Sequence, residues 1–220
     1  QYERLASRSG PTEGVVMRPS DDKPPQRIAW LQCVGSRDEQ AGRGYCSQVC
    51  CRYALRLARL LKARLPDVTI TVHKMDLQTT GRDICPTWEA ARQEGLRVIV
   101  GLPAVIRRAP DDPRAATLLY DDILGDAFDA ATYDLVVLST GIRPRADAAH
   151  VAEAFGINQD RYGFFATGAD GSSTLTPGVF AAGDIREKSL RQVITAAADG
   201  AIAAMEANAY IEGYCLVNAG

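Results

Sequence analysis

Apolar and polar residues alternate along the chain with periods that predict strands and helices in turn. The apolar segment 27–34 predicts a strand, and apolar residues recur at helical spacing from about Ser47 to Leu65. The β-branched segment 66–76 predicts a second strand, and segment 85–95 predicts a helix with an early proline and a terminal glycine. Strand–helix–strand order predicts a parallel sheet that is covered on both faces.

Further along the chain the pattern changes twice. Segments 96–110 and 115–124 predict strands of a small antiparallel meander, and 133–142 predicts an apolar strand that ends in glycine. After it we expect a short helix at 147–156, a buried strand at 178–184 and a long Ala-rich helix at 189–211. Residues 1–25 predict a connector with one short strand at 14–18. The fold class is therefore α/β, with a Rossmann-like domain at 26–142.

Composition limits the functional classes. The 220 residues are 46% hydrophobic and 24% charged, with a net charge of −2, as in an ordinary soluble globular protein. Such a charge favours neither nucleic acid nor an anionic membrane surface as a partner. No apolar run approaches the roughly 20 residues of a membrane-spanning helix, and no signal peptide opens the chain. Because the first residue is Gln1, we expect a processed, truncated or partial chain.

Four of the six cysteines lie in one short stretch. Cys33, Cys46, Cys50 and Cys51 have the spacing C-x₁₂-C-x₃-CC, between the first strand and the first helix. Adjacent cysteines are poor disulfide partners, and a clustered set without a secretory signal favours a metal or redox role in a reducing compartment. We therefore expect a cytoplasmic location, or one at the periphery of a membrane complex.

Three chemistries compete for these cysteines. Zinc accepts four thiolates but usually takes two C-x₂-C knuckles, and a redox dithiol of the thioredoxin type uses C-x-x-C, which this chain lacks. We expect Cys46 and Cys50 on one face of a first helical turn, with Cys51 turned about 100° away. That spread suits a [4Fe–4S] cluster, whose negative charge the helix N-terminus, Arg37 and Arg43 would ease. Structural zinc and redox thiols remain alternatives.

The other two cysteines give a weaker signal. Cys215 and Cys85 are single residues outside the cluster, and small buried thiols pack like Ala or Val.

A second motif pair lies in the later half. The strand that ends at Asp184 places this carboxylate where open α/β sheets bind ligands, although a helix-capping role is equally compatible. With "VVLSTGIRP" upstream, "GVFAAGD" resembles the two-dinucleotide-domain flavoproteins, and the segment after it resembles their thioredoxin reductase branch. This resemblance implies FAD binding. It assigns Thr140 and Gly141 to the return from the NAD(P) domain, Gly183 and Asp184 to the ribityl chain, and Arg191 and Gln192 to the border of the isoalloxazine ring.

The cysteine segment carries a closer resemblance. "IAWLQCVGSRDEQ…GYCSQVCCRYALRLARLLK" resembles the A subunit of heterodisulfide reductase and its relatives, which include the quinone-interacting oxidoreductase subunits of sulfate reducers. The resemblance implies that Cys33, Cys46, Cys50 and Cys51 ligate a [4Fe–4S] cluster and that the partners are other redox subunits; a homodimer stays open. It makes 143–213 the C-terminal portion of an FAD-binding domain, with 214–220 as a tail and without the N-terminal FAD half.

The chain departs from this family in several ways. No G-x-G-x-x-G occurs, and Gly35, Gly42 and Gly44 have the wrong spacing for a dinucleotide fingerprint. We therefore expect no ordinary NAD(P) binding, although Asp76 follows the second strand where a ribose-binding acid would lie. The ferredoxin signature C-x₂-C-x₂-C-x₃-CP is also absent. The C-terminal segment is nearer thioredoxin reductase than heterodisulfide reductase.

The remaining candidates favour packing roles. His73 and His150 are isolated, and a catalytic histidine needs an orienting partner. Trp30 and Trp88 are expected in the core, and the arginine row of the first helix in solvent. The resulting hypothesis is an oxidoreductase subunit that passes electrons between FAD and the cluster toward partner subunits. The alternatives are an FAD-dependent thiol–disulfide reductase that uses Cys46, Cys50 and Cys51, and a non-catalytic module with structural zinc.

Overall fold

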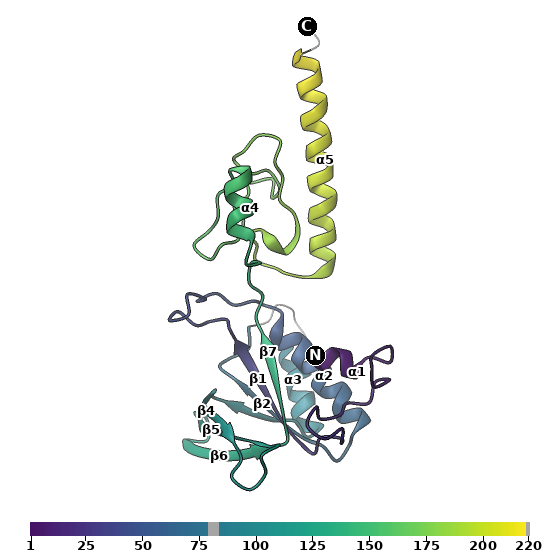
Figure 1. Cartoon of the computed structure of the whole chain (residues 1–220), viewed down its shortest axis with the longest axis vertical. Coiled ribbons are helices and arrows are strands. Elements are labelled where there is room, and N and C mark those ends of the chain that lie inside the picture. The colour runs from purple at the N-terminus through teal and green to yellow at the C-terminus, as the bar shows by residue number, and fades with distance from the viewer. Residues whose placement is uncertain (79–83, 219–220) are drawn as a thin grey trace. The chain divides into compact units, whose positions relative to one another are not determined.

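The computed structural model describes the backbone of residues 1–78 and 84–218, and the side chains of residues 1–78 and 86–213 (Figure 1). Contacts divide the chain into two compact units. The first comprises Gln1–Arg37 and Val49–Gly141, and the second comprises Asp38–Gln48 and Ile142–Gly220.

A parallel sheet forms the centre of the first unit. Its strands are β1 (Arg27–Val34), β2 (Thr69–Lys74), β3 (Arg97–Val100) and β7 (Leu135–Thr140), in the order β3-β2-β1-β7. All three pairings are parallel, which confirms the predicted sheet. Because β3 pairs with β2 at the edge of this sheet, its predicted place in the meander was wrong.

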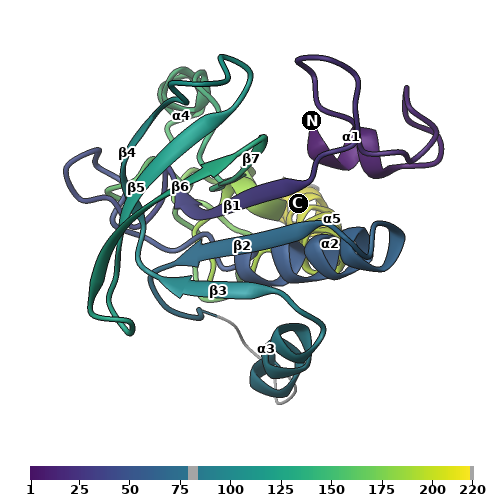
Figure 2. The same cartoon turned by 90° about the horizontal axis from the view of Figure 1, so that it is seen from below.

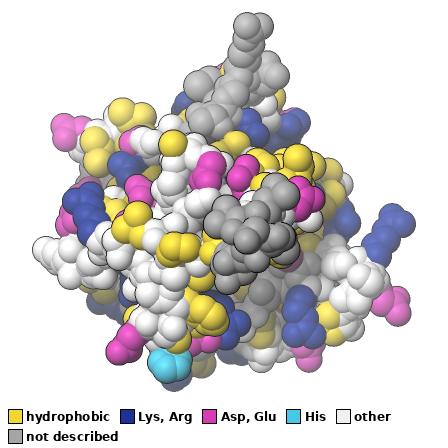
Figure 3. Space-filling model, turned by 90° about the horizontal axis from the view of Figure 1, so that it is seen from above, with side chains coloured by type: hydrophobic (Ala, Val, Ile, Leu, Met, Phe, Trp, Pro, Cys, Tyr) yellow, Lys and Arg dark blue, Asp and Glu magenta, His cyan; other side chains and the backbone are white. Residues whose placement is uncertain are grey.

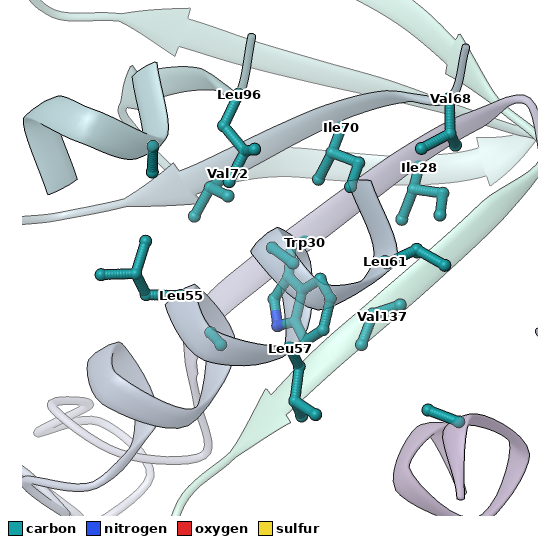
Figure 4. Packing of buried hydrophobic residues seen from close by; sticks show 14 of the residues in the cluster. Ile28, Trp30, Leu55, Leu57, Leu61, Val68, Ile70, Val72, Leu96 and Val137 are labelled. Atoms are coloured by element: carbon teal, nitrogen blue, oxygen red, sulfur yellow. The ribbon is translucent and has the colours of Figure 1, made fainter. Parts of the chain in front are cut away.

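Two helices cover one face of the sheet, α2 (Cys50–Arg64) and α3 (Ile84–Gln93) (Figure 2). Trp30 points from β1 toward α2 (Figure 4). Leu57 of α2 and Val137 of β7 lie next to its ring. The indole Nε1 donates to the Ser139 hydroxyl over 2.9 Å, so its polar atom is satisfied in the core. The buried cluster contains Ala6, Val16, Ile28, Trp30, Ala54, Leu55, Leu57, Ala58, Leu61, Val68, Ile70, Val72, Trp88, Ala91, Leu96 and Val137.

The antiparallel meander packs against the opposite face. Its strands are β4 (Pro103–Arg108), β5 (Ala116–Asp122) and β6 (Ala127–Tyr133), in that order. Alternating inward residues of β1 and β5 build a second core with Leu31, Leu118 and Tyr120. The predicted meander is therefore confirmed, with β6 as a strand that the pattern had not singled out.

The N-terminal connector differs from its prediction. It carries a short helix, α1 (Tyr2–Ala6), and no strand at 14–18. The Tyr2 ring packs edge-on against Trp30 with centroids 4.8 Å apart, and Arg64 Nη1 donates to the Ala6 carbonyl over 2.8 Å. These tertiary contacts hold the segment in a way that local composition does not encode.

The second unit is built from irregular segments and helices. It contains α4 (Ala148–Phe155), the 3₁₀ turn η1 (Gly183–Ile185) and α5 (Val193–Asn218), drawn green to yellow in Figure 1. The strand predicted at 178–184 was wrong, because its pairing with a neighbouring backbone is too short to form a strand. Among the described residues this segment has a single bridge, from Phe180 to Ser173, before it turns into η1.

The surface carries charges of both signs. Lys or Arg and Asp or Glu side chains are interspersed on the face shown in Figure 3, as the small net charge predicts. Several large apolar side chains of α5 are exposed, namely Val193, Ile194, Ile202, Met205, Tyr210 and Ile211. No helix in the described part of the chain is long and apolar enough to cross a membrane.

Candidate functional site

Cys33 lies at an irregularity in β1. The register between β1 and β7 shifts between Leu31 and Val34, and Cys33 has a left-handed backbone with φ 59°. Bulges of this kind redirect a side chain and are frequent next to binding sites. The strand therefore turns the Cys33 side chain out of its regular alternation, at the carboxyl edge of the parallel sheet.

Backbone strain concentrates in the loop that follows. Cys33, Arg37 and Gln48 account for three of the six described non-glycine residues with positive φ, and Gly35 and Gly42 are also left-handed. Each non-glycine residue in this region costs on the order of 1–3 kcal/mol, and such strain clusters at functional sites. Side-chain contacts hold the loop, among them an ion pair between Arg37 and Asp76.

Cys50 and Cys51 occupy the first turn of α2. Both are 6% exposed, and no acidic residue lies in this turn. A helix N-terminus carries partial positive charge, which favours thiolate over thiol. Cys50 Sγ lies 3.9 Å from the Thr140 carbonyl oxygen, which also accepts a 3.3 Å hydrogen bond from the Tyr53 hydroxyl. The structure therefore brings Cys50 and Thr140 together at the sheet edge.

Gly141 lies directly after Thr140 at the end of β7. Its amide donates to the Val34 carbonyl over 2.9 Å, which continues the pairing of β7 with β1. It therefore lies at the same carboxyl edge as Cys33.

Cys46 belongs to the loop segment that forms part of the second unit. The Tyr45 hydroxyl donates to the Ile142 carbonyl over 2.8 Å, and the Ile142 amide donates to Ser47 Oγ over 2.8 Å. The Gln48 amide lies 3.3 Å from Cys46 Sγ and donates to it. Because α2 begins only at Cys50, the expectation that Cys46 and Cys50 share one helical face was wrong.

The four cysteines fit a cluster by donor chemistry rather than by a preformed cage. The structure gives Cys33, Cys46, Cys50 and Cys51 as thiols and not as disulfides. Four thiolates are the ligand set of a [4Fe–4S] cluster. Within the described part of the chain, no three His, Cys, Asp or Glu side chains are already gathered as a metal site. The side chains of Cys85 and Cys215 lie outside the described residues.

In the second unit, a buried ion-pair network fixes the Gly-Asp turn. Asp199 on α5 accepts from Arg186 Nη2 over 2.7 Å, from Lys188 Nζ over 2.7 Å and from the Gly183 amide over 3.2 Å. Its hydrogen bond with Arg186 holds the pKa of this carboxyl well below its usual range. Gly183 has φ 78°, a conformation that side-chain-bearing residues rarely adopt. The network therefore sets the position of both Gly183 and Asp184.

Two predicted flavin residues have buried polar atoms without hydrogen bonds. Arg191 is 6% exposed, its guanidinium lies over the Phe164 ring at 4.1 Å, and its Nε has no hydrogen-bond partner. Asp184 Oδ1 likewise accepts none, although Lys188 Nζ lies 3.6 Å away. Buried polar groups are nearly always satisfied, so these atoms fit a polar ligand such as FAD. Gln192 follows, half-buried, and its backbone N–H donates to Thr195 Oγ over 3.2 Å.

Sequence reasoning missed Asp199 and Phe164. Asp199 lies within an Ala-rich helix, where an acidic residue is typically solvent-exposed, and no sequence signal showed that it faces Gly183. Phe164 had no motif at all. The histidines behave as packing and surface residues, because His73 is fully buried and His150 is exposed on α4.

The chain has clear relatives among known proteins. Residues 42–200 match the family described as pyridine nucleotide-disulphide oxidoreductase. One of the A-type iron-sulfur subunits of the CoB–CoM heterodisulfide reductase of Methanopyrus kandleri is 43% identical over 166 residues, which are 75% of this chain and 25% of that protein. The A subunit of the H(2):CoB-CoM heterodisulfide,ferredoxin reductase of Methanothermobacter marburgensis is 36% identical over 187 residues, 83% of this chain and 28% of that protein.

The chain thus spans about a quarter of the length of these curated relatives. Among solved structures, Lactococcus lactis thioredoxin reductase aligns with a TM-score of 0.58 and 23% identity, over 86% of this chain and 54% of that chain. The thioredoxin reductase of T. acidophilum aligns with a TM-score of 0.56 and 17% identity, over 86% and 53%. These two support the fold alone. The chain belongs to the pyridine nucleotide-disulphide oxidoreductase family, and its resemblance to the A subunit of heterodisulfide reductase is confirmed.

Proposed function

We propose that the chain is part of a flavin- and iron–sulfur-dependent oxidoreductase subunit. It would pass electrons between FAD and a [4Fe–4S] cluster toward partner subunits of a heterodisulfide reductase-like complex. The observation that carries the proposal is the cysteine set at the sheet edge: Cys33 at a strained bulge, and Cys50 and Cys51 buried in the first turn of α2. The names of the relatives, which are iron-sulfur and ferredoxin-reductase subunits, support it.

The chain's own residues supply ligands and charge for the cluster. Each of the four ligands would lose its thiol proton, and the resulting thiolates would bind the cluster. These ligands are Cys33, Cys46, Cys50 and Cys51. The N-terminus of α2 offsets part of the accumulated negative charge. When bound, FAD would supply two-electron chemistry with single-electron release, and a [4Fe–4S] cluster would supply one-electron transfer.

For the flavin we propose the second unit as the C-terminal portion of an FAD-binding domain. Asp184 Oδ1 would accept hydrogen bonds from hydroxyl groups of the ribityl chain, at the turn that Asp199 fixes. Arg191 would offer its Nε–H at the border of the ring system, next to Gln192, because Phe164 holds the guanidinium in place. Thr140 and Gly141 would mark the passage from the NAD(P)-type domain.

Ordinary NAD(P) binding does not belong to the proposal. In a dinucleotide-binding domain, a glycine-rich turn after the first strand approaches the pyrophosphate. Here the loop after β1 carries cysteines, and its glycines do not have the spacing of that turn. Asp76, the candidate ribose-binding acid, is engaged by Arg37 and by Gln78 Nε2, which donates over 3.1 Å.

The test is the content of iron, zinc and acid-labile sulfide per chain, in protein purified without oxygen. We expect about four iron and four sulfide per chain, as a cluster with four cysteine ligands requires. Cys51→Ala should lower both several-fold, whereas the matched control Cys215→Ala should leave both unchanged. One zinc per chain would contradict the proposal and make the cysteines a structural zinc site. No metal at all would contradict it and make them redox thiols.

A further inference from the structure

A pocket in the second unit is lined by three arginines and two tyrosines. It has a volume of about 290 Å³, just below the usual range of ligand sites, so it suits a small ligand. Arg43 and Tyr45 come from the cysteine loop, Arg143 and Arg145 follow β7, and Tyr162 comes from the segment after α4. All of these residues lie within one compact unit, so the pocket does not depend on the placement of the other unit.

The positive charge of this pocket is only partly neutralised by the described residues. Arg145 pairs with Asp147 through two hydrogen bonds of 2.9 Å, but Arg43 and Arg143 form no ion pair with any described side chain. A fourth guanidinium lies close by, since Arg161 is stacked over the Tyr162 ring at 4.6 Å. Guanidinium groups that line one pocket repel one another, and an anion between them removes that cost.

Two carboxylates beside the pocket, those of Asp38 and Asp160, already accept hydrogen bonds. Asp38 Oδ1 accepts from the Ala41 amide over 3.0 Å. Asp160 Oδ1 accepts from the Tyr162 amide over 2.8 Å and from the Phe164 amide over 2.9 Å. Asp160 therefore holds the backbone of this segment. Among the described residues it forms no ion pair with a guanidinium group.

The start of α4 adds a second source of positive potential. Its N-cap residue, Asp147, makes no side-chain capping bond because it is paired with Arg145. Ala149, in the first turn, lines the pocket. Uncapped amides at a helix N-terminus point toward an anion, so they act in the same direction as the arginines.

The walls also give the pocket a fixed shape. The Tyr45 and Tyr162 rings lie 4.7 Å apart, and the Tyr45 hydroxyl is held by the Ile142 carbonyl over 2.8 Å. Aromatic rings anchored in this way lose little freedom on binding, and they offer flat contact area to the ligand.

We propose that this pocket binds a small phosphate-bearing ligand. Guanidinium groups form paired, charge-assisted hydrogen bonds with phosphate, which gives both strength and geometry. Arg43 and Arg143 would contact the phosphate oxygens, with Tyr45 and Tyr162 beside the remainder of the ligand. The phosphate would come either from an inorganic anion or from a nucleotide, and the proposal does not depend on the flavin or the cluster.

The test is calorimetric titration of the full chain with inorganic pyrophosphate, ADP and sulfate at constant ionic strength. We expect pyrophosphate to bind at least about tenfold more tightly than sulfate, and the double variant Arg43→Gln/Arg143→Gln to lose at least about tenfold in affinity. If ADP binds more tightly than pyrophosphate, the ligand is a nucleotide. If the two bind with equal affinity, the pocket recognises the phosphate groups alone. Pyrophosphate no tighter than sulfate would overturn the proposal.

A matched control separates the pocket from general charge. Arg107 and Arg108 on β4 are exposed and form no ion pair within the described residues, so Arg107→Gln/Arg108→Gln removes the same charge elsewhere. This variant should keep the affinity of the parent chain, and an equal loss would overturn the proposal. Iron content and the thermal unfolding midpoint of each variant show whether the cluster loop and the fold stay intact.

Discussion

Acid should destabilise the first unit through a single buried histidine. His73 on β2 is 0% exposed, with its ring edge-on to Tyr120 at 4.7 Å and to Tyr133 at 6.2 Å. Neither ring nitrogen makes a hydrogen bond of normal geometry. Burial lowers the pKa of His73 from 6.5 to about 4, and the Arg97 charge acts in the same direction. The Asp122 charge and the Gly101 backbone raise this pKa slightly against the effect of burial.

The magnitude follows from the difference between the folded and unfolded pKa values. Since the folded pKa of about 4 lies below the unfolded value of 6.5, the unfolded chain binds more protons between these limits, and stability falls as the pH falls through them. The full effect is about 3 kcal/mol at about 1.4 kcal/mol per pKa unit. About 2 kcal/mol of it is lost between pH 7 and pH 5.

The assay is urea unfolding at pH 7 and pH 5 for the parent chain and for His73→Leu. Leucine keeps the apolar volume and removes the titrating ring, so the variant lacks this part of the pH dependence. The parent should lose about 2 kcal/mol more than the variant over this range, because contributions of other groups cancel in the difference. The control His150→Gln replaces an exposed histidine on α4 and should follow the parent.

One result would refute the reasoning. If the parent and His73→Leu lost the same free energy of unfolding between pH 7 and pH 5, His73 would have to titrate alike in the folded and unfolded chains. The ring would then have a polar partner or access to water, and burial would not control its ionisation.

Two further predictions concern the second unit. Asp199→Asn should lower the free energy of unfolding at pH 7 by about 3 kcal/mol in urea titrations, because it leaves Arg186 and Lys188 buried without their carboxylate. Since Asp199 has a lowered pKa, its contribution should be present above pH 4 and fade at lower pH. Arg191→Ala should reduce FAD retained after gel filtration at least about tenfold, measured by flavin fluorescence, while Arg107→Ala should not; equal retention would contradict the flavin assignment.

The order of strands and helices in the first unit could be predicted because burial there is periodic. Ala54, Leu55, Leu57, Ala58 and Leu61 recur at helical spacing, and all five are buried. Apolar runs likewise predicted β1 and β7, since parallel strands covered on both faces have no polar side, and β-branched residues predicted β2. Local pattern and tertiary packing agree in these elements.

Prediction failed where the outcome depends on distant partners. Segment 178–184 has the composition of a buried strand but only one bridge to a neighbouring backbone among the described residues. The amphipathic pattern of α2 extends back to Ser47, yet the backbone turns left-handed at Gln48, so the helix begins at Cys50. Neither the length of a segment's backbone pairing nor a strained loop residue is encoded in the spacing of apolar side chains.

The sheet edge that binds phosphate in dinucleotide-binding domains can instead carry cysteine ligands. Glycine in a dinucleotide fingerprint lets backbone approach a pyrophosphate closely, and the helix N-terminus behind it favours negative charge. Under the proposed function, side chains rather than backbone reach the bound group, so the glycine spacing is no longer required, whereas the N-terminus of α2 still favours the negative charge of thiolates. The cost moves to the loop, where Cys33 and Gln48 adopt the left-handed backbone that glycine would hold without strain. Under the proposed function, this strain is the conformational cost of a site whose ligands are side chains.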